Sequence, residues 1–218
     1  MIEKMDFETN DNISLLILGD TGSGKTHLAS TLGYIMPTLC INIEKKKQTL
    51  KKFKNKLTVL TGDNVFDVNY IINSDNYKHK YSAMVIDSIS HLQEIELIDI
   101  AGEKKIPSIQ DYGICNNKFL RLMLNYDFSE KHLICTSTLK EVTIGDVTQL
   151  KPAIRGSFGD NLGRWFNVIA LLKVLPNKNR RLYFHYNLCV TKSEFANFPE
   201  YIDNPTCKDI WELANFGR

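Results

Sequence analysis

Residues 19–26, GDTGSGKT, fit the phosphate-binding loop pattern G-x-x-x-x-G-K-[ST], and the rest of the chain is interpreted around them. Glycine at three of these positions lets the backbone wrap closely around a phosphate, with its amide groups pointing inward. Lys25, which we expect to be exposed, supplies positive charge to the β- and γ-phosphates, and Thr26 offers its hydroxyl to Mg²⁺. The predicted nucleotide-binding residues are Gly19, Asp20, Thr21, Gly22, Ser23, Gly24, Lys25, Thr26 and His27.

The segments on either side of this loop support the motif. Residues 13–18 are apolar, which predicts a buried parallel strand. Residues 24–35 place Leu28, Leu32 and Ile35 at helical spacing, which predicts a helix. Because strand, loop and helix follow in the order that the motif requires, a chance glycine-rich turn is the weaker alternative.

A second apolar run, AMVIDS at residues 83–88, ends on a carboxylate. A buried strand here would deliver Asp87 to the carboxyl edge of a parallel sheet, where the phosphate loop also lies. Mg²⁺ needs an anionic ligand at that place, and a strand of this kind, called Walker B, supplies it. We therefore predict Thr26 and Asp87 as the metal ligands.

Glu44 is the predicted catalytic base. Many ATPases of the AAA+ class carry Asp-Glu at the end of the Walker B strand, whereas this chain has Asp87-Ser88. Glu44 follows the apolar run at residues 38–43, which places its carboxylate on the same sheet edge as the phosphates. There it would orient the attacking water, with Lys25 as the second catalytic residue. The alternative is a surface glutamate at the start of a lysine-rich helix.

Residues 45–56, KKKQTLKKFKNK, carry seven lysines and no acidic residue. We expect a helix in this segment. Two interpretations of its charge stay open, namely a solvated helix face or a contact with a phosphate backbone. The net charge of the whole chain, +2, favours neither of them.

Length and composition indicate one ordinary α/β domain. The chain has 218 residues, of which 43% are hydrophobic and 24% charged, and we treat residues 1–218 as a single domain. The apolar runs are too short for a membrane span, and the N-terminus lacks the apolar core of a signal peptide. The five cysteines are dispersed, which predicts reduced and mostly buried thiols. We expect a cytoplasmic protein with no membrane partner.

The other elements follow from apolar periodicity and from breaks at glycine and proline. Strands are predicted at residues 13–18, 38–43, 57–60, 81–87, 132–138, 167–175 and 181–190, the last two as an antiparallel pair. Helices are predicted at residues 24–35, 45–56, 66–74, 89–101, 111–126 and 207–215. Residues 1–12 are expected to form a tail or edge strand, and the glycine-rich residues 139–163 a mobile loop bordered by short elements.

In the order and spacing of these motifs, residues 13–192 resemble RecA-like recombinases. TLCINIEKKK resembles their catalytic-glutamate strand, AMVIDSISHL their Walker B strand, and HLICTSTLK their phosphate-sensing strand. The compact size and the segments IDSISHL and IQDYG resemble the small RecA-like proteins of bacteriophages, some of which act as single-strand annealing ATPases. The resemblance implies a P-loop NTPase fold with a RecA-like core, in which helices flank a mainly parallel sheet that ends in an antiparallel strand pair.

The same resemblance implies a DNA-stimulated ATPase that uses ATP and Mg²⁺ and acts on single-stranded DNA in recombination or replication, in a bacterial or phage-infected cell. It assigns γ-phosphate sensing to Ser137 and Thr138, where recombinases carry glutamine. Within a homo-oligomer, Lys192 would reach the nucleotide of a neighbouring subunit. Two DNA-binding loops are implied, at residues 102–113 and 139–163, and basic residues with aromatic neighbours suit single strands. The candidate contacts are Lys104, Lys105 and Tyr112 in the first loop and Lys140, Lys151, Arg155 and Arg164 in or beside the second.

Two other classes of function stay open from the sequence. One is an AAA+-type helicase loader, or another P-loop NTPase such as a small-molecule kinase. The Asp87-Ser88 pair and the lack of a lid-type arginine cluster weigh against it. The other is a nucleotide-gated scaffold without enzymatic activity, against which the intact Glu44 weighs mildly. Measuring ATP hydrolysis with and without single-stranded DNA separates the three.

Overall fold

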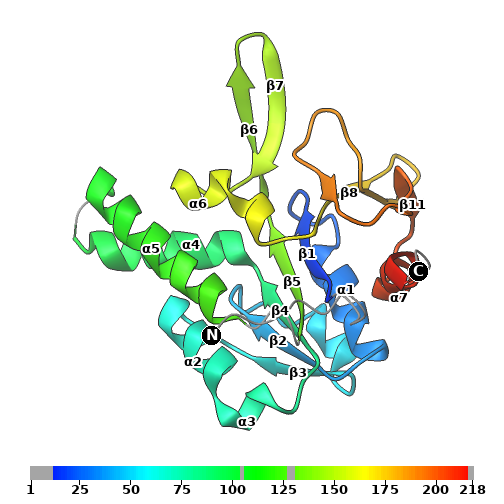
Figure 1. Ribbon diagram of the computed structural model, residues 1–218, viewed down its shortest axis with the longest axis horizontal. Helices are drawn as coiled ribbons and strands as arrows, with labels where there is room; N and C mark the ends of the chain where they lie inside the picture. The colour runs from blue at the N-terminus through cyan, green and yellow to red at the C-terminus, as the bar shows by residue number, and fades with distance from the viewer. Residues whose placement is uncertain (1–11, 104–105, 127–130, 216–218) are drawn as a thin grey trace, which may run out of the picture.

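The computed structural model describes residues 12–103, 106–126 and 131–215, and it is organised around one nine-stranded sheet (Figure 1). The strands of this sheet are β1 (Ser14–Leu18), β2 (Thr38–Asn42), β3 (Leu57–Leu60), β4 (Ala83–Asp87), β5 (His132–Ser137), β8 (Val168–Val174), β9 (Arg180–Tyr183), β10 (Lys192–Ser193) and β11 (Tyr201–Asp203). Their spatial order is β11-β9-β8-β1-β5-β4-β2-β3, with β10 paired to β8. The six strands from β8 to β3 pair in parallel, and β9, β10 and β11 pair antiparallel. The predicted mainly parallel sheet with an antiparallel C-terminal part is therefore confirmed.

Helices cover both faces of this sheet, because its central strands are apolar on both sides. The helices are α1 (Lys25–Ser30), α2 (Val65–Asn73), α3 (Asp75–Lys78), α4 (Ile89–Ala101), α5 (Ile109–Asn125), α6 (Gly156–Asp160) and α7 (Cys207–Asn215). On one face, Leu16 and Leu18 of β1 pack with α2, α4 and α5. On the other face, Leu15 and Ile17 pack with α1 and α7. None of the described helices is long and apolar enough to cross a membrane.

The strand order brings the predicted site together at one edge. β5 lies between β1 and β4, and β2 lies on the far side of β4, with Asn42 in register with Asp87. The backbone amides of Ile43 and Glu44 both donate to the Asp87 carbonyl, at 2.8 and 3.3 Å. Because parallel strands end at the same edge, the phosphate loop, Glu44, Asp87 and Thr138 lie close together.

Several predicted elements agree closely with the structure. α4 and α7 have the predicted bounds, α2 and α5 differ from theirs by one or two residues, and all five cysteines are free and buried. The predicted helix at 24–35 is α-helical only to Ser30 and continues as a 3-10 helix, Thr31–Tyr34. β9 ends at Tyr183, so the predicted strand at 181–190 is too long. Residues 1–11 of the predicted tail lie outside the described residues.

The prediction of a helix at residues 45–56 is wrong. Lys45 has a positive φ of 55°, and the only helical piece is a short 3-10 turn, Leu50–Phe53. The segment lacks an apolar stripe, and its two large apolar side chains, Leu50 and Phe53, are both buried. One turn is enough to bury this pair, so packing does not favour a longer helix.

The prediction of a mobile loop at residues 139–163 is also wrong. The segment forms a hairpin of β6 (Leu139–Ile144) and β7 (Val147–Pro152), followed by α6 and a 3-10 turn, Leu162–Arg164. Ile144 pairs with Val147 across a two-residue turn in which Gly145 takes a φ of 59°. Glycine here sets the turn of a regular hairpin. The hairpin projects away from the main sheet (Figure 1).

Candidate nucleotide-binding site

A cavity of about 490 Å³ lies at the carboxyl edge of the sheet. It is lined by Thr21, Gly22, Gly24, Lys25, Thr26, His27, Glu44, Lys46, Thr49, Lys52, Asp87, Thr138 and Arg180. The lining combines the phosphate loop with residues at the ends of β2, β4 and β5 and with Arg180 at the start of β9. Three predicted nucleotide-binding residues, Gly19, Asp20 and Ser23, do not line it but shape the loop. Gly19 donates its amide to the Ser137 carbonyl at 3.3 Å, and the Ser23 amide donates to the Asp20 carbonyl at 3.1 Å.

The phosphate loop has the backbone that its glycines permit. Gly22 and Gly24 take φ values of 84° and 101°, which side chains with a Cβ rarely adopt. A Cβ at Gly24 would also lie 2.5 Å from the Nε of Arg180. The α1 helix begins directly after Gly24, so its free amides face the cavity.

Lys25 is buried, with 8% of its surface exposed, so the prediction that it is exposed is wrong. Its Nζ donates to the Gly19 carbonyl at 2.7 Å and to the Asp20 carbonyl at 2.9 Å. The phosphate loop thus wraps around Lys25, whose ammonium donates hydrogen bonds to the two backbone carbonyls at the start of the loop. Burial lowers the pKa of Lys25, while the charges of Asp87 and Glu44 oppose that shift.

Asp87 and Thr26 lie together as the metal-ligand prediction requires. The Thr26 hydroxyl donates to Asp87 Oδ2 at 2.8 Å, and the Thr136 hydroxyl donates to Asp87 Oδ1. Asp87 is 4% exposed, and burial raises its pKa. A buried carboxylate beside a hydroxyl fits Mg²⁺, which prefers oxygen ligands and would restore the charged form. Thr136 was not predicted, because no motif marks it and its contact with Asp87 depends on the pairing of β5 with β4.

Glu44 faces the same cavity from the end of β2. Its Oε1 accepts a hydrogen bond from the Ser88 hydroxyl at 3.1 Å, and its Oε2 pairs with Lys46 Nζ at 2.5 Å. Burial acts to raise the pKa of Glu44, but the hydrogen bonds from Lys46 and Ser88 outweigh it and lower the pKa. The carboxylate is therefore held in its charged form, as a base requires.

The two predicted phosphate sensors lie differently. Thr138 lines the cavity, and its amide and hydroxyl both approach Ser90 Oγ, at 3.2 and 3.3 Å. Ser137 is fully buried and donates its hydroxyl to the Thr138 carbonyl at 2.9 Å. Successive residues at a strand end point in opposite directions, so only Thr138 is brought to the cavity. Phosphate sensing by either residue stays a prediction.

Arg180 belongs to the cavity and was not predicted. Its Nε donates to the Ser23 carbonyl at 3.0 Å, and its charge adds to burial in lowering the pKa of His27. Asn204 holds the Arg180 backbone through hydrogen bonds of 2.6 and 3.1 Å. No sequence motif marks Arg180, because its position depends on the pairing of β9 with β8.

Lys192, the predicted residue for a neighbouring subunit, makes its contacts within this chain. Its Nζ donates to the carbonyls of Gly163 at 2.7 Å and Phe166 at 3.2 Å, and it pairs with Glu194 at 2.5 Å. Lys192 does not line the nucleotide cavity. A role in a homo-oligomer stays a prediction.

The predicted DNA contacts are spread out. Lys140 Nζ donates to the Ile154 carbonyl at 2.6 Å, and Arg155 donates to the Tyr112 hydroxyl at 3.1 Å, which joins the two implied DNA loops. Lys151 lies opposite Lys140 in the hairpin. Lys104 and Lys105 lie outside the described residues.

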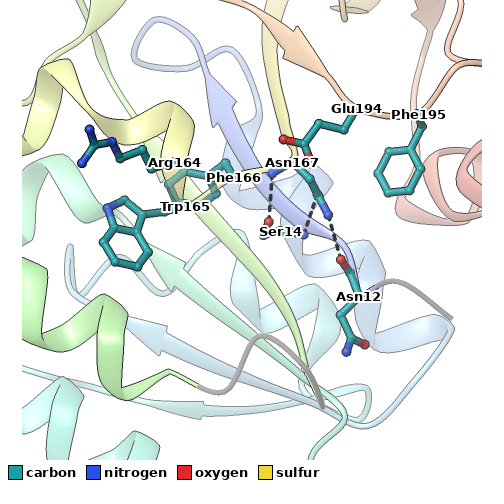
Figure 2. Close-up of a pocket in the computed structure, with 8 residues that line it drawn as sticks. All are labelled: Asn12, Ser14, Arg164, Trp165, Phe166, Asn167, Glu194 and Phe195. Atoms are coloured by element: carbon teal, nitrogen blue, oxygen red, sulfur yellow. Dashed lines mark hydrogen bonds between the residues drawn. The ribbon is translucent and has the colours of Figure 1, made fainter. Parts of the chain in front are cut away.

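Arg164 lies at a different place, beside a second cavity of about 590 Å³. Asn167 bridges the wall of this cavity through hydrogen bonds with Ser14 and Asn12 (Figure 2). Figure 2 shows Arg164 directed away from Asn167. Because Ser14 begins β1 and the phosphate loop follows its end, this cavity lies at the opposite end of that strand. The structure therefore separates Arg164 from the nucleotide cavity.

Comparison with known proteins agrees with this geometry. A search of curated proteins found no match. A family model described as an AAA domain matches residues 11–193. The matched range contains the whole lining of the nucleotide cavity, from Thr21 to Arg180. The chain therefore belongs to the AAA domain family of P-loop ATPases.

Proposed function

We propose that this protein binds ATP with Mg²⁺ at the carboxyl-edge cavity and hydrolyses it, with Glu44 as the base. The observation that carries the proposal is the position of Glu44. It lines the same cavity as Lys25 and Asp87, although the residue directly after Asp87 is a serine and not an acid. A glutamate shortly after β2 that lines the cavity supports a RecA-like arrangement of this core.

Each part of the cavity has a defined task in this mechanism. Lys25 would exchange its carbonyl partners for phosphate oxygens, beside the amides at the start of α1. Thr26 and Asp87 would hold Mg²⁺, which neutralises the charge that develops on the phosphates. Glu44, kept ionised by Lys46 and Ser88, would orient the attacking water and accept its proton.

Arg180 offers a test of the phosphate part of the cavity. Arg180→Ala should weaken ATP binding by about tenfold or more, since a hydrogen bond to a charged group contributes about 1.5–3 kcal/mol. Isothermal titration calorimetry with ATP, ADP and AMP measures the loss and shows which phosphate is involved. Arg180→Lys should recover part of the affinity.

The neighbouring arginine is the matched control. Arg181 belongs to the same strand, but its side chain pairs with Asp203 at 2.6 Å and lies over the Tyr201 ring at 3.8 Å. Arg181→Ala should leave ATP affinity unchanged while removing the same charge. Equal losses in both variants would show that net charge, and not contact at the phosphate loop, sets the affinity.

We further propose that single-stranded DNA is the partner and that it binds residues 139–165. The hairpin starts directly after Thr138, which lines the cavity, and the Ala153 amide donates to the Thr138 carbonyl at 2.8 Å. A nucleotide contact at Thr138 would therefore act on both strands of the hairpin at their base. ATP hydrolysis measured with and without single-stranded DNA is the first test.

The salt dependence of DNA binding tests the same contact quantitatively. For single strands, log K falls with log salt by about 0.7 per phosphate contact. Replacing Lys151 and Arg155 with alanine should reduce that slope by about one to two and leave ATP affinity nearly unchanged. Fluorescence anisotropy of a labelled oligonucleotide over a salt series measures it. A wild-type protein without salt-dependent affinity for single strands would rule out this partner.

A further inference from the structure

The lysine segment, residues 45–56, is a surface element anchored in the core and not a solvated helix. Leu50 and Phe53 are buried, with 5% and 3% of their surface exposed, and they belong to the core cluster beneath α1. The backbone amide of Lys51 donates to the Lys47 carbonyl at 2.9 Å, which closes a turn around the first anchor, Leu50. The seven lysine side chains are all exposed around this anchored turn.

Most of this charge is not neutralised by the protein. Lys45 pairs with Asp63 at 2.5 Å and Lys46 pairs with Glu44. Four other lysines make no side-chain hydrogen bond or ion pair with any residue that the structure describes; these are Lys47, Lys51, Lys52 and Lys54. Like charges gathered in this way repel one another, and a bound polyanion neutralises them while releasing its own counterions.

The segment also continues into the nucleotide cavity and has an aromatic neighbour. Lys46, Thr49 and Lys52 line the cavity, so the basic surface begins at the ATP site. Tyr34 is 61% exposed beside it, with Lys56 5.5 Å from its ring centre. Cationic side chains next to an exposed ring suit single-stranded nucleic acid, whose backbone is charged and whose bases stack.

We propose that the lysine segment and Tyr34 form a second binding surface for single-stranded nucleic acid, next to the ATP cavity. The proposal extends the nucleic-acid part of the proposed function. The segment follows β2 and the hairpin follows β5, and these parallel strands end at one edge of the sheet. A single strand lying on the lysine segment therefore passes the mouth of the cavity on its way toward the hairpin.

The test removes only lysines that do not line the cavity. A triple variant, Lys47→Ala with Lys51→Ala and Lys54→Ala, should reduce the salt slope by about two and the affinity at 0.1 M salt by roughly 100-fold. The matched control replaces three exposed lysines elsewhere, Lys80, Lys178 and Lys208, and should change neither quantity. The probe is a labelled oligothymidine in an anisotropy titration with the full chain.

A substitution at Tyr34 tests the contribution of base stacking separately from that of charge. Tyr34→Leu keeps an apolar contact with Phe53, whose ring centre lies 5.8 Å away, but removes the stacking surface. It should weaken oligothymidine binding by about tenfold with an unchanged salt slope. The same variant should bind inorganic polyphosphate as the wild type does.

Three outcomes overturn the proposal. They are an unchanged affinity in the triple lysine variant, an equal loss in the control set, or no effect of Tyr34→Leu on oligothymidine. ATP hydrolysis without nucleic acid is measured on the same variants and should stay at the wild-type rate. Loss of oligonucleotide binding with intact hydrolysis supports the surface, whereas a wild-type protein that fails to hydrolyse ATP contradicts the proposed ATPase and not this surface.

Discussion

Lys25→Ala is expected to weaken ATP binding by about 100-fold or more. The ammonium would contact two phosphates, and each hydrogen bond to a charged group contributes about 1.5–3 kcal/mol. Two such bonds amount to at least about 3 kcal/mol, and each 1.4 kcal/mol is a factor of ten in affinity. Calorimetric titration with ATP and Mg²⁺ measures the loss.

Because Lys25 is buried, this experiment needs a control for the stability of the variant. Its removal leaves the carbonyls of Gly19 and Asp20 without their donor, which costs about 1–3 kcal/mol of stability. Thermal unfolding without nucleotide must therefore accompany the titration. Lys25→Met keeps most of the buried stem and separates the loss of charge from the loss of packing. Undiminished ATP affinity in both folded variants would contradict the phosphate-loop assignment.

Glu44→Gln is expected to lower ATP turnover by about 100-fold or more, while nucleotide still binds. Glutamine keeps the size of the side chain and still accepts a hydrogen bond from Ser88, but it cannot take a proton from water. It also loses the ion pair with Lys46. Single-turnover hydrolysis, together with calorimetric binding, measures chemistry and affinity separately.

Two further measurements identify the role of Glu44. Ser88→Ala should lower turnover less than Glu44→Gln, because Ser88 orients the carboxylate without touching substrate. Since the pKa of Glu44 is lowered from 4.5, its contribution to turnover should persist down to that pH and disappear only as pH falls further. Unchanged turnover in Glu44→Gln would place the base elsewhere and leave Glu44 as a surface residue.

The parts of the site that follow from local patterns could be predicted from the sequence. The phosphate loop depends on glycine conformation and on a helix start, both encoded within a few residues. Asp87 ends β4 and Glu44 lies two residues beyond β2, and the strand order places both beside the loop. Arg180 and Thr136 could not be found in this way, because each reaches the site through strand pairings between distant segments.

Other predictions were wrong because a local structure was inferred from the type of residue in a segment. The glycines of residues 139–163 suggested mobility, yet Gly145 sets a hairpin turn of fixed length. The seven lysines of residues 45–56 suggested a helix, yet the two buried apolar side chains require only one turn. Lys25 was expected to be exposed, yet the loop supplies carbonyls that bind it internally. Packing against the core determined the structure of the lysine-rich residues, whereas contacts within a few residues determined the positions of Gly145 and Lys25.

The central position of β1 determines when this protein can fold during its synthesis. β1 pairs with β5 on one side and β8 on the other, with Leu15 opposite both Ile134 and Val168. The strand that carries the phosphate loop is thus synthesised well before both of its partners. Such distant pairings slow folding, and until β8 emerges one edge of β1 stays open to other chains. We therefore expect a nascent chain of this protein to expose this strand edge to chaperones while residues 138–174 are translated.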